Sequence, residues 1–229
     1  MCATERGGNQ PRAIESKLTP ASTGFTLTGA KRWSTMGPVA GVLLVVASEG
    51  IDENGRNKIR LVRVDAAAPG VEIGLMPAPT FMPEVPHGAI ALDRVAVDSA
   101  AVLPGDGYAR YVKPFRTVED IHIHGALLGY VISVARRFAW PHDTIERLAA
   151  SVAATRALAL VDPSSAEGHI ALAGLLAHDA RLLQELAPSW ANVDVAERER
   201  WERDSALFGS VAGEIRELRR QRAWEALGN

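Results

Sequence analysis

Two adjacent acids and two nearby histidines have types and spacing that could do chemistry: Glu119, Asp120, His122 and His124. A positioned carboxylate can act as a general base, and histidine is a common metal ligand. Residues two apart point to different faces of a helix, so His122 and His124 would need carboxylates from elsewhere to bind a metal. Two acids at a helix start also complement its dipole. We therefore expect no metal site, and the two acids remain open to a chemical or a structural role.

The composition limits the classes of protein to which the chain can belong. It has 229 residues, a formal net charge of −2 and 47% hydrophobic residues, which is typical of a globular protein and not of a disordered one. No apolar run is long enough to span a membrane. The near-neutral charge argues against nucleic acid as the main partner. The single cysteine, Cys2, fits a cytoplasmic location, and the polar start predicts no signal peptide.

The first 107 residues predict a β domain. Short β-branched segments, several with period-two alternation, are separated by glycine and proline, and Asn54-Gly55 is a strong tight-turn signal. The expected strands cover residues 24–28, 41–47, 59–64, 71–75 and 89–97. This spacing favours a β-barrel or sandwich over βαβ units.

Residues 108–229 predict an antiparallel four-helix bundle, which makes the fold class α+β. We expect a first helix over residues 117–138 and a second capped by Asp143. A third helix would start with a capping box formed by Ser164 and Glu167. A single fourth helix would run from Asp194 to Leu227, with Phe208, Val211, Ile215 and Leu218 along its apolar seam.

Three segments resemble the middle domain of acyl-CoA dehydrogenases. They are residues 2–8 (CATERGG), residues 27–35 (LTGAKRWST) and residues 89–97 (AIALDRVAV). The second is similar to the Leu-x-Gly-x-Lys-x-Trp-Ile-Thr hairpin of that family and is the most specific. Residues 138–141 (FAWP) also resemble the family's Phe-Gly-x-Pro turn between bundle helices. The resemblance implies the middle β domain and the C-terminal helical domain, without the N-terminal helical domain usual in the family.

This resemblance implies FAD as the cofactor and an acyl-CoA or other acyl thioester as the substrate. A flavin needs an aromatic wall and a few fixed hydrogen-bond donors. The resemblance assigns the pyrimidine edge of the flavin to Met1, Ala3 and Thr4, the ring to Trp33 and the redox edge to Thr35. Ser34, between Trp33 and Thr35, is also expected to bind the cofactor. Taken alone, Trp33 would instead be expected as a core tryptophan.

The resemblance also suggests a base for removal of the substrate's α-proton. The family's usual C-terminal glutamate has no match in residues 188–229. A minority of the family carries it ten residues before the glycine of a Leu-Gly pair, where this chain has Glu119 before Gly129. The family's next residue is an arginine, and here it is Asp120. Gln10, which matches the serine of the family's N-terminal motif, and Asp120 are the expected substrate-binding residues.

Other departures leave two functions open. The family's diphosphate-binding arginine falls on Ala135, so Arg136 and Arg137 are the expected substitutes, and Arg6 and Glu146 stand where the family has proline and glutamine. The first possibility is an FAD-dependent oxidoreductase of fatty acid metabolism, which oxidises the CH–CH bond of an acyl thioester and works as a homodimer or homotetramer. The second is a degenerate, non-catalytic relative that is structural or is completed by a separate partner.

Overall fold

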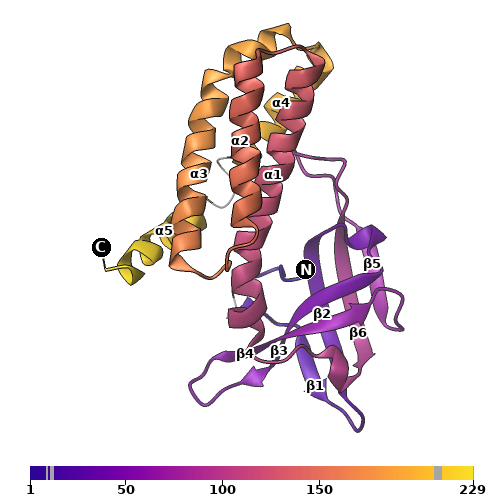
Figure 1. Ribbon diagram of the computed structural model, residues 1–229. Helices are drawn as coiled ribbons and strands as arrows, with labels where there is room; N and C mark the ends of the chain where they lie inside the picture. The colour runs from indigo at the N-terminus through magenta and orange to yellow at the C-terminus, as the bar shows by residue number, and fades with distance from the viewer. Residues whose placement is uncertain (9, 11–12, 209–212, 229) are drawn as a thin grey trace. The chain divides into compact units, whose positions relative to one another are not determined.

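The computed structural model describes residues 1–8, 10, 13–208 and 213–228. The chain divides into two compact units, Met1–Lys113 and Pro114–Asn229. The first is built on a β-sheet and the second is helical (Figure 1). The expected α+β class is therefore confirmed. No described helix is both long and apolar enough to cross a membrane.

The β unit contains a single mixed sheet of six strands, in the order β4-β3-β1-β2-β6-β5. The strands are β1 Lys17–Pro20, β2 Phe25–Thr35, β3 Val42–Ile51, β4 Asn57–Asp65, β5 Val71–Leu75 and β6 His87–Val97. All five predicted strands are present. The first strand was not predicted, because its four residues (KLTP) contain no apolar run. Leu27–Thr35, expected as a hairpin, lies within the single strand β2.

Pairing is antiparallel except between β1 and β3, where Lys17 pairs in parallel with Ser48. Because successive side chains of a strand point to opposite faces, one face of the sheet forms the core. Leu27, Val45 and Val62 are fully buried in it. Gly29 permits the close approach of the segment before β1. A Cβ atom on Gly29 would lie 2.3 Å from Oγ of Ser16. The asparagine–glycine turn is present, with Gly55 at φ +73°.

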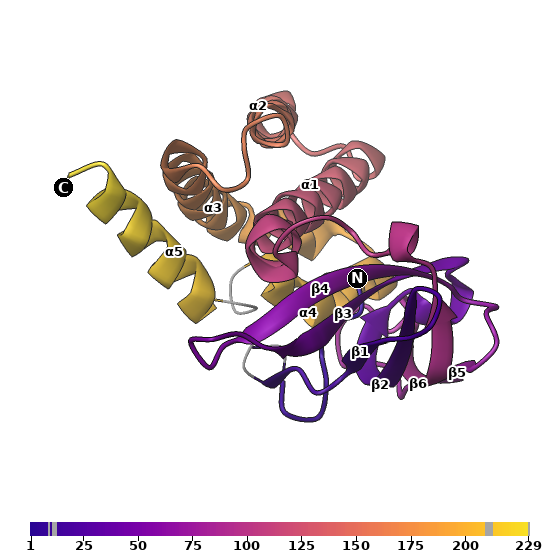
Figure 2. The ribbon, with the colours of Figure 1, turned by 90° about the horizontal axis from the view of Figure 1, so that it is seen from below.

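The helical unit has three long helices, α1 Lys113–Arg137, α2 His142–Leu158 and α3 Ala166–Glu185, which lie side by side (Figures 1 and 2). A π-helical turn at Tyr108–Val112 leads into α1. Leu128, Leu148 and Leu182, one from each long helix, are fully buried in a shared core. This core includes Trp190, which stacks on Trp201 and meets Trp140 edge-on.

The prediction of a single, continuous fourth helix is wrong. It consists of α4 Val195–Asp204, a 3-10 turn at Ser205–Phe208 and α5 Gly213–Ala226. Val211 lies outside the described residues, and the side chains of Ile215 and Leu218 are exposed. The predicted apolar seam is therefore not buried as expected. The simple four-helix bundle is not confirmed.

Two helix starts also differ from the prediction by one residue. Ser165, not Ser164, caps α3 by accepting a hydrogen bond from the amide of Gly168 at 3.1 Å. The α2 helix begins at His142, so Asp143 lies in its first turn instead of capping it. Asp194, where the fourth helix was expected to start, caps α4, and its carboxylate accepts from the Glu197 amide at 2.9 Å. Short polar side chains compete for neighbouring cap positions, which sequence alone does not separate.

Candidate functional site

A break in the register of β2 places Trp33 at the surface. The pairing with β6 shifts between Lys31 and Ser34, and Trp33 within the shift adopts the left-handed conformation, with φ at 55°. Lys31 and Ser34 are both buried, whereas Trp33 is 45% exposed. In a regular strand Trp33 would share a face with Lys31. The bulge reverses that alternation, so Trp33 is not the core residue that a regular strand would make it.

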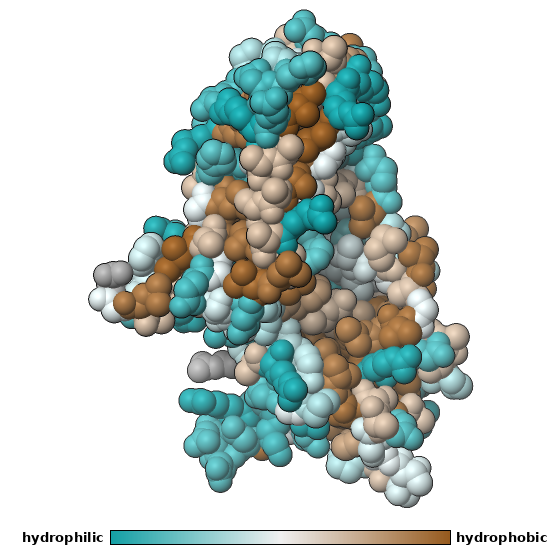
Figure 3. All heavy atoms as spheres, in the orientation of Figure 1, coloured by the Kyte–Doolittle hydropathy of each residue, from teal (hydrophilic) through white to brown (hydrophobic). Residues whose placement is uncertain are grey.

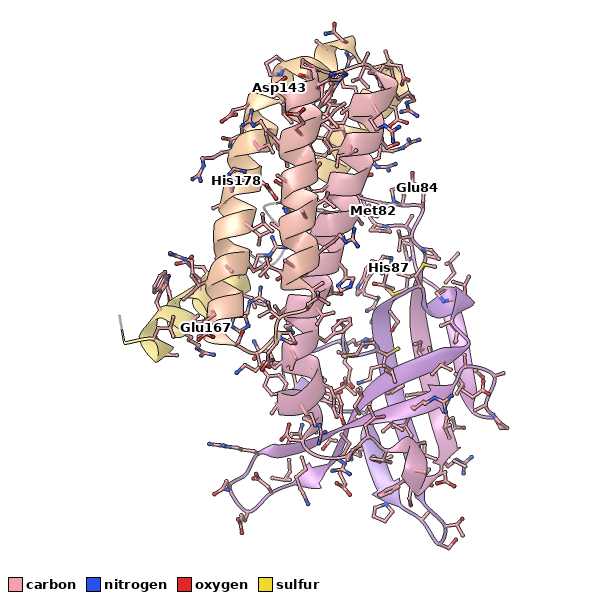
Figure 4. The ribbon with its side chains drawn as sticks, in the orientation of Figure 1. Met82, Glu84, His87, Asp143, Glu167 and His178 are labelled. Carbon is pink, nitrogen blue, oxygen red and sulfur yellow. The ribbon has the colours of Figure 1, made fainter. Side chains whose placement is uncertain are left out.

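Thr35 and His87 are direct cross-strand partners beside Trp33. Nε2 of His87 lies 3.2 Å from Oγ1 of Thr35, and Nδ1 lies 2.9 Å from the carbonyl oxygen of Val85. The His87 ring meets the Trp33 ring edge-on, with centroids 6.0 Å apart. His87 begins β6, next to the loop that carries Met82 and Glu84 (Figure 4). Sequence reasoning missed His87, because only the strand register places it beside Thr35.

The first residues of the chain join this part of the sheet. Cys2 forms a parallel bridge with Val45, and the carbonyl of Thr4 accepts a hydrogen bond from the Arg32 amide at 2.8 Å. Met1, Ala3 and Thr4 are each half-buried. The structure therefore brings the segment with Thr4 next to the strand with Trp33. These are two of the three segments on which the family resemblance rests.

A buried ion pair lies beneath the same stretch of β2. Oε1 of Glu5 accepts from Nζ of Lys31 at 2.5 Å and from the Ser16 hydroxyl at 2.6 Å. Burial alone would raise the pKa of Glu5, but the hydrogen bonds from Lys31, Ser16 and the Glu15 amide outweigh it and lower the pKa. An open hollow of about 700 Å³ adjoins the pair. Its lining includes Arg6, Arg32, Glu72 and the small residues Gly74 and Ala89.

Gln10 is exposed, and its carbonyl accepts from the Ala13 amide at 2.9 Å. Residues 9, 11 and 12 around it lie outside the described part of the chain. The described contacts of Gln10 are thus limited to this local turn.

Glu119 and Asp120 have different environments on α1. Asp120 is buried and bound by two guanidinium groups of α5, with Arg216 at 2.9 Å and Arg219 closer still. Glu119 is exposed. Desolvation, followed by the charge of Asp120, raises the pKa of Glu119, while Arg116 opposes the shift. Asp120 therefore acts as an anchor for α5, which its position beside Glu119 in the sequence does not reveal.

Arg136 and Arg137 end α1 and line an open hollow of about 460 Å³ with Gly129, Ile132 and Ser133. Arg137 pairs with Glu197 at 2.9 Å, and Glu197 also accepts from the Tyr130 hydroxyl at 2.6 Å. Arg136 is exposed, whereas Ala135 is completely buried in the helical core. Seventeen residues separate Glu119 from Arg136, which is about 25 Å along a helix. The two expected functions of α1 therefore lie at opposite ends of that helix.

The histidines of α1 form protein contacts. Nδ1 of His122 lies 2.8 Å from the Val118 carbonyl oxygen. His124 is buried, and its Nε2 lies 2.6 Å from Oδ2 of Asp179. The other carboxylate oxygen of Asp179, Oδ1, accepts from the Ser151 hydroxyl at 2.5 Å. Within the described residues no group of three or more histidine, cysteine or acidic side chains could hold a metal ion.

The end of β2 fits a flat heteroaromatic ring. It presents an exposed indole and the exposed hydroxyl of Thr35. Ser34 Oγ is buried and has no hydrogen-bond partner among the described atoms, so a polar group there is left unsatisfied by the protein. A backbone in an uncommon conformation at an exposed aromatic residue also suggests a functional role. The residues present thus fit the ring of a flavin at this position.

Taken together, a mixed sheet with an exposed aromatic site, followed by long helices, defines a two-unit α+β protein. Residues 1–95 match the family model described as the acyl-CoA dehydrogenase middle domain. The resemblance of the first 95 residues to the middle domain of acyl-CoA dehydrogenases is therefore confirmed.

Solved structures show the same fold over nearly the whole chain. A probable acyl-CoA dehydrogenase from Mycobacterium abscessus is 17% identical, with a TM-score of 0.71 over 96% of this chain and 67% of that one. Butyryl-CoA dehydrogenase from Megasphaera elsdenii is 15% identical, with a TM-score of 0.66 over 97% and 67%. Glutaryl-coenzyme A dehydrogenase in complex with glutaryl-CoA is 17% identical, with a TM-score of 0.66 over 99% and 65%.

The chain thus spans about two thirds of the length of these structures. No curated protein matches its sequence.

Proposed function

We propose that this chain binds FAD and takes part in oxidation of the CH–CH bond of an acyl thioester. The observation that carries the proposal is the exposed Trp33, held in a left-handed conformation beside Thr35. A bulge that turns a tryptophan out of the core loses its hydrophobic burial, about 1.5–3 kcal/mol for a large apolar side chain. A planar ligand that covers the indole would recover this burial.

In this proposal the β unit holds the flavin ring. Met1, Ala3 and Thr4 hold its pyrimidine edge, Trp33 covers its face, Ser34 supplies a hydroxyl, and Thr35 donates to the redox edge. The half-buried segment of Thr4, tied to the Arg32 amide, supports this placement. When bound, the flavin supplies the acceptor for the hydride that leaves the β-carbon of the substrate.

In the helical unit we propose Glu119 as the base that removes the α-proton. Its raised pKa and exposure suit a carboxylate that must accept a proton and release it again. Gln10 and Asp120 are proposed as substrate-binding residues. Because arginines already bind the carboxylate of Asp120, this residue would affect the substrate indirectly, by positioning its neighbour Glu119.

Arg136 and Arg137 are proposed to bind the cofactor diphosphate. These arginines lie about 25 Å from Glu119 along one helix. This distance favours an arrangement in which Glu119 and the two arginines serve different ends of one cofactor, or two different cofactor molecules. We therefore propose a homodimer or homotetramer. Hydrophobic side chains at the surface of both units are consistent with association (Figure 3).

A second candidate is a non-catalytic relative that keeps the scaffold. It is favoured by the burial of Ala135 where the family has its diphosphate arginine, and by the pairing of Arg137 with Glu197. Such a protein would bind FAD weakly or not at all, and it would serve as a structural or partner-binding subunit.

A flavin titration separates the two candidates. The purified protein is titrated with FAD, and binding is followed through the flavin absorbance band and tryptophan fluorescence. Saturable binding, weakened about 5- to 150-fold in Trp33→Ala, supports the proposal, because an aromatic contact of this kind contributes about 1–3 kcal/mol. Trp224→Ala, which removes a similarly exposed tryptophan in α5, is the matched control. Absence of saturable binding would favour the non-catalytic relative.

A further inference from the structure

His87 makes two polar contacts whose chemistry determines where its protons are. The carbonyl oxygen of Val85 can only accept, so Nδ1 of His87, at 2.9 Å, must carry a hydrogen. In the neutral imidazole, Nε2 then has a lone pair and no hydrogen. At 3.2 Å from Nε2, the Thr35 hydroxyl must therefore donate its only hydrogen to His87.

Protonation of His87 reverses the direction of this second hydrogen bond. The imidazolium carries a hydrogen on both nitrogens, so Nε2 donates and Oγ1 of Thr35 accepts. The hydroxyl hydrogen of Thr35 is then free to point to another acceptor. Thr35 is exposed, so this acceptor can come from outside the protein.

We propose that His87 is a positioning residue that controls whether Thr35 donates a hydrogen bond to a ligand placed against Trp33. The ligand class is a planar heteroaromatic with an acceptor at its edge, and the inference rests on the proposed binding of a flavin here. The cationic form of His87 makes Thr35 a donor to the ligand. With neutral His87, the Thr35 hydroxyl donates its hydrogen to Nε2 instead.

The surrounding backbone holds these groups in one frame. Met36 N donates to the Pro86 carbonyl at 2.8 Å, and Met76 N donates to the His87 carbonyl at 2.8 Å. The Trp33 amide donates to Sδ of Met76 at 3.0 Å. The strand that carries Trp33 and Thr35 is therefore tied to both sides of His87. A change in the hydrogen-bond direction at His87 needs no movement of the strands.

The charged groups on the elements packed around His87 are few. Its partner strand β2 carries Lys31, which is buried against Glu5, and Arg32; β5 carries Glu72. The turn at residues 37–39 carries no charge, and the loop before His87 carries Glu84. Histidine is the side chain whose ordinary titration lies closest to neutral pH, so a pH series around neutrality tests both directions of the Thr35 hydrogen bond.

The first arm of the test uses the protein without any ligand. The ¹⁵N shifts of histidine-labelled protein, assigned with His87→Gln, should show the neutral imidazole of His87 as the Nδ1–H tautomer. The Thr35→Val variant should shift the Nε2 signal, because it removes the hydroxyl donor. An Nε2–H tautomer in the wild type would overturn the inference, whether or not a flavin binds.

The second arm measures FAD affinity from pH 5.5 to 8.5 by the fluorescence titration. The wild type should bind about 2- to 12-fold more tightly at the acid end, which is the range for gain of one hydrogen bond. Thr35→Val should bind weakly at every pH. His87→Phe keeps a ring against Trp33 and leaves Thr35 free, so its affinity should match the acid wild type at every pH.

The His87→Gln variant gives a second route if His87→Phe fails to fold, because its amide cannot titrate and should remove the pH dependence. His142→Gln, at an exposed histidine in the first turn of α2, is the matched control and should keep the pH dependence. Binding with a pH-independent affinity in the wild type would overturn this inference and leave the proposed function standing. Absence of FAD binding at every pH would overturn both.

Discussion

The ammonium group of Lys31 lies 2.5 Å from Oε1 of Glu5, and both side chains are closed to solvent, with 0% and 4% exposure. This pair joins the N-terminal segment to β2, two residues before the exposed Trp33. Since an isolated buried charge is costly, the two residues depend on each other. The site that presents Trp33 is thus supported from below by a buried charge pair.

Removal of Lys31 should destabilise the β unit strongly. We expect Lys31→Met to lower the free energy of unfolding by about 3–5 kcal/mol, because Glu5 remains buried without its counter-charge. Urea denaturation measures the loss, and Lys17→Met, at an exposed lysine in β1, is the control. Equal losses in the two variants would contradict the role of the pair. Glu5→Gln combined with Lys31→Met should recover part of the lost stability.

The lowered pKa of Glu5 predicts a loss of stability in acid. The pKa of Glu5 is lower in the folded state than in the unfolded chain, where it has its ordinary value of 4.5. Its contribution is complete above that pH and is lost as the pH falls through the lower folded pKa. Urea denaturation from pH 6 to pH 3 should show a shallower acid decline in Glu5→Gln. An unchanged decline would assign it to other groups.

Asp120 should act as a structural anchor for α5. Asp120→Asn removes the charge that Arg216 and Arg219 bind, and charged hydrogen bonds of this kind contribute about 1.5–3 kcal/mol. Amide hydrogen exchange in α5 should increase, with little change in the β unit. Asp143→Asn, at an exposed acid of α2, provides the comparison. Unchanged protection of α5 would mean that other contacts, such as buried Ala223, hold the helix.

The left-handed backbone of Trp33 predicts an unusual response to glycine. Trp33→Gly should be about 1 kcal/mol more stable than Trp33→Ala, since glycine adopts φ near 55° without a steric cost. At the neighbouring Arg32, where φ is not positive, glycine should be less stable than alanine by about 0.5–1 kcal/mol. Thermal unfolding of the four variants measures the difference in stability between glycine and alanine at each position, and its sign should differ between the two. The same sign at both positions would refute the bulge.

Glu119 is open to a kinetic test if the wild type oxidises acyl-CoA substrates. Glu119→Gln should lower turnover about 10²-fold and leave FAD affinity unchanged, because the amide cannot accept the α-proton. Wild-type turnover should rise with pH as Glu119 loses its proton, with a midpoint above the ordinary glutamate value of 4.5. Full activity in Glu119→Gln would place the base elsewhere.

Most of the sheet and the long helices could be predicted from local pattern. Period-two alternation in residues 59–64 and 24–28 specifies strands, and the turn at Asn54-Gly55 needs only a residue that tolerates positive φ. The family resemblance also lies in short motifs that can be read without a structure. These features depend on neighbours in sequence, so the sequence by itself determined them.

The tertiary structure decided the features that depend on residues far apart. Trp33 is exposed because β2 shifts its register against β6, and His87 joins the site only through that pairing. Asp120 is bound by arginines almost one hundred positions later in the chain. A bulge or an ion pair is selected by packing energies summed over distant segments. Neither has a signature in the local sequence that would distinguish it from a regular strand or an exposed acid.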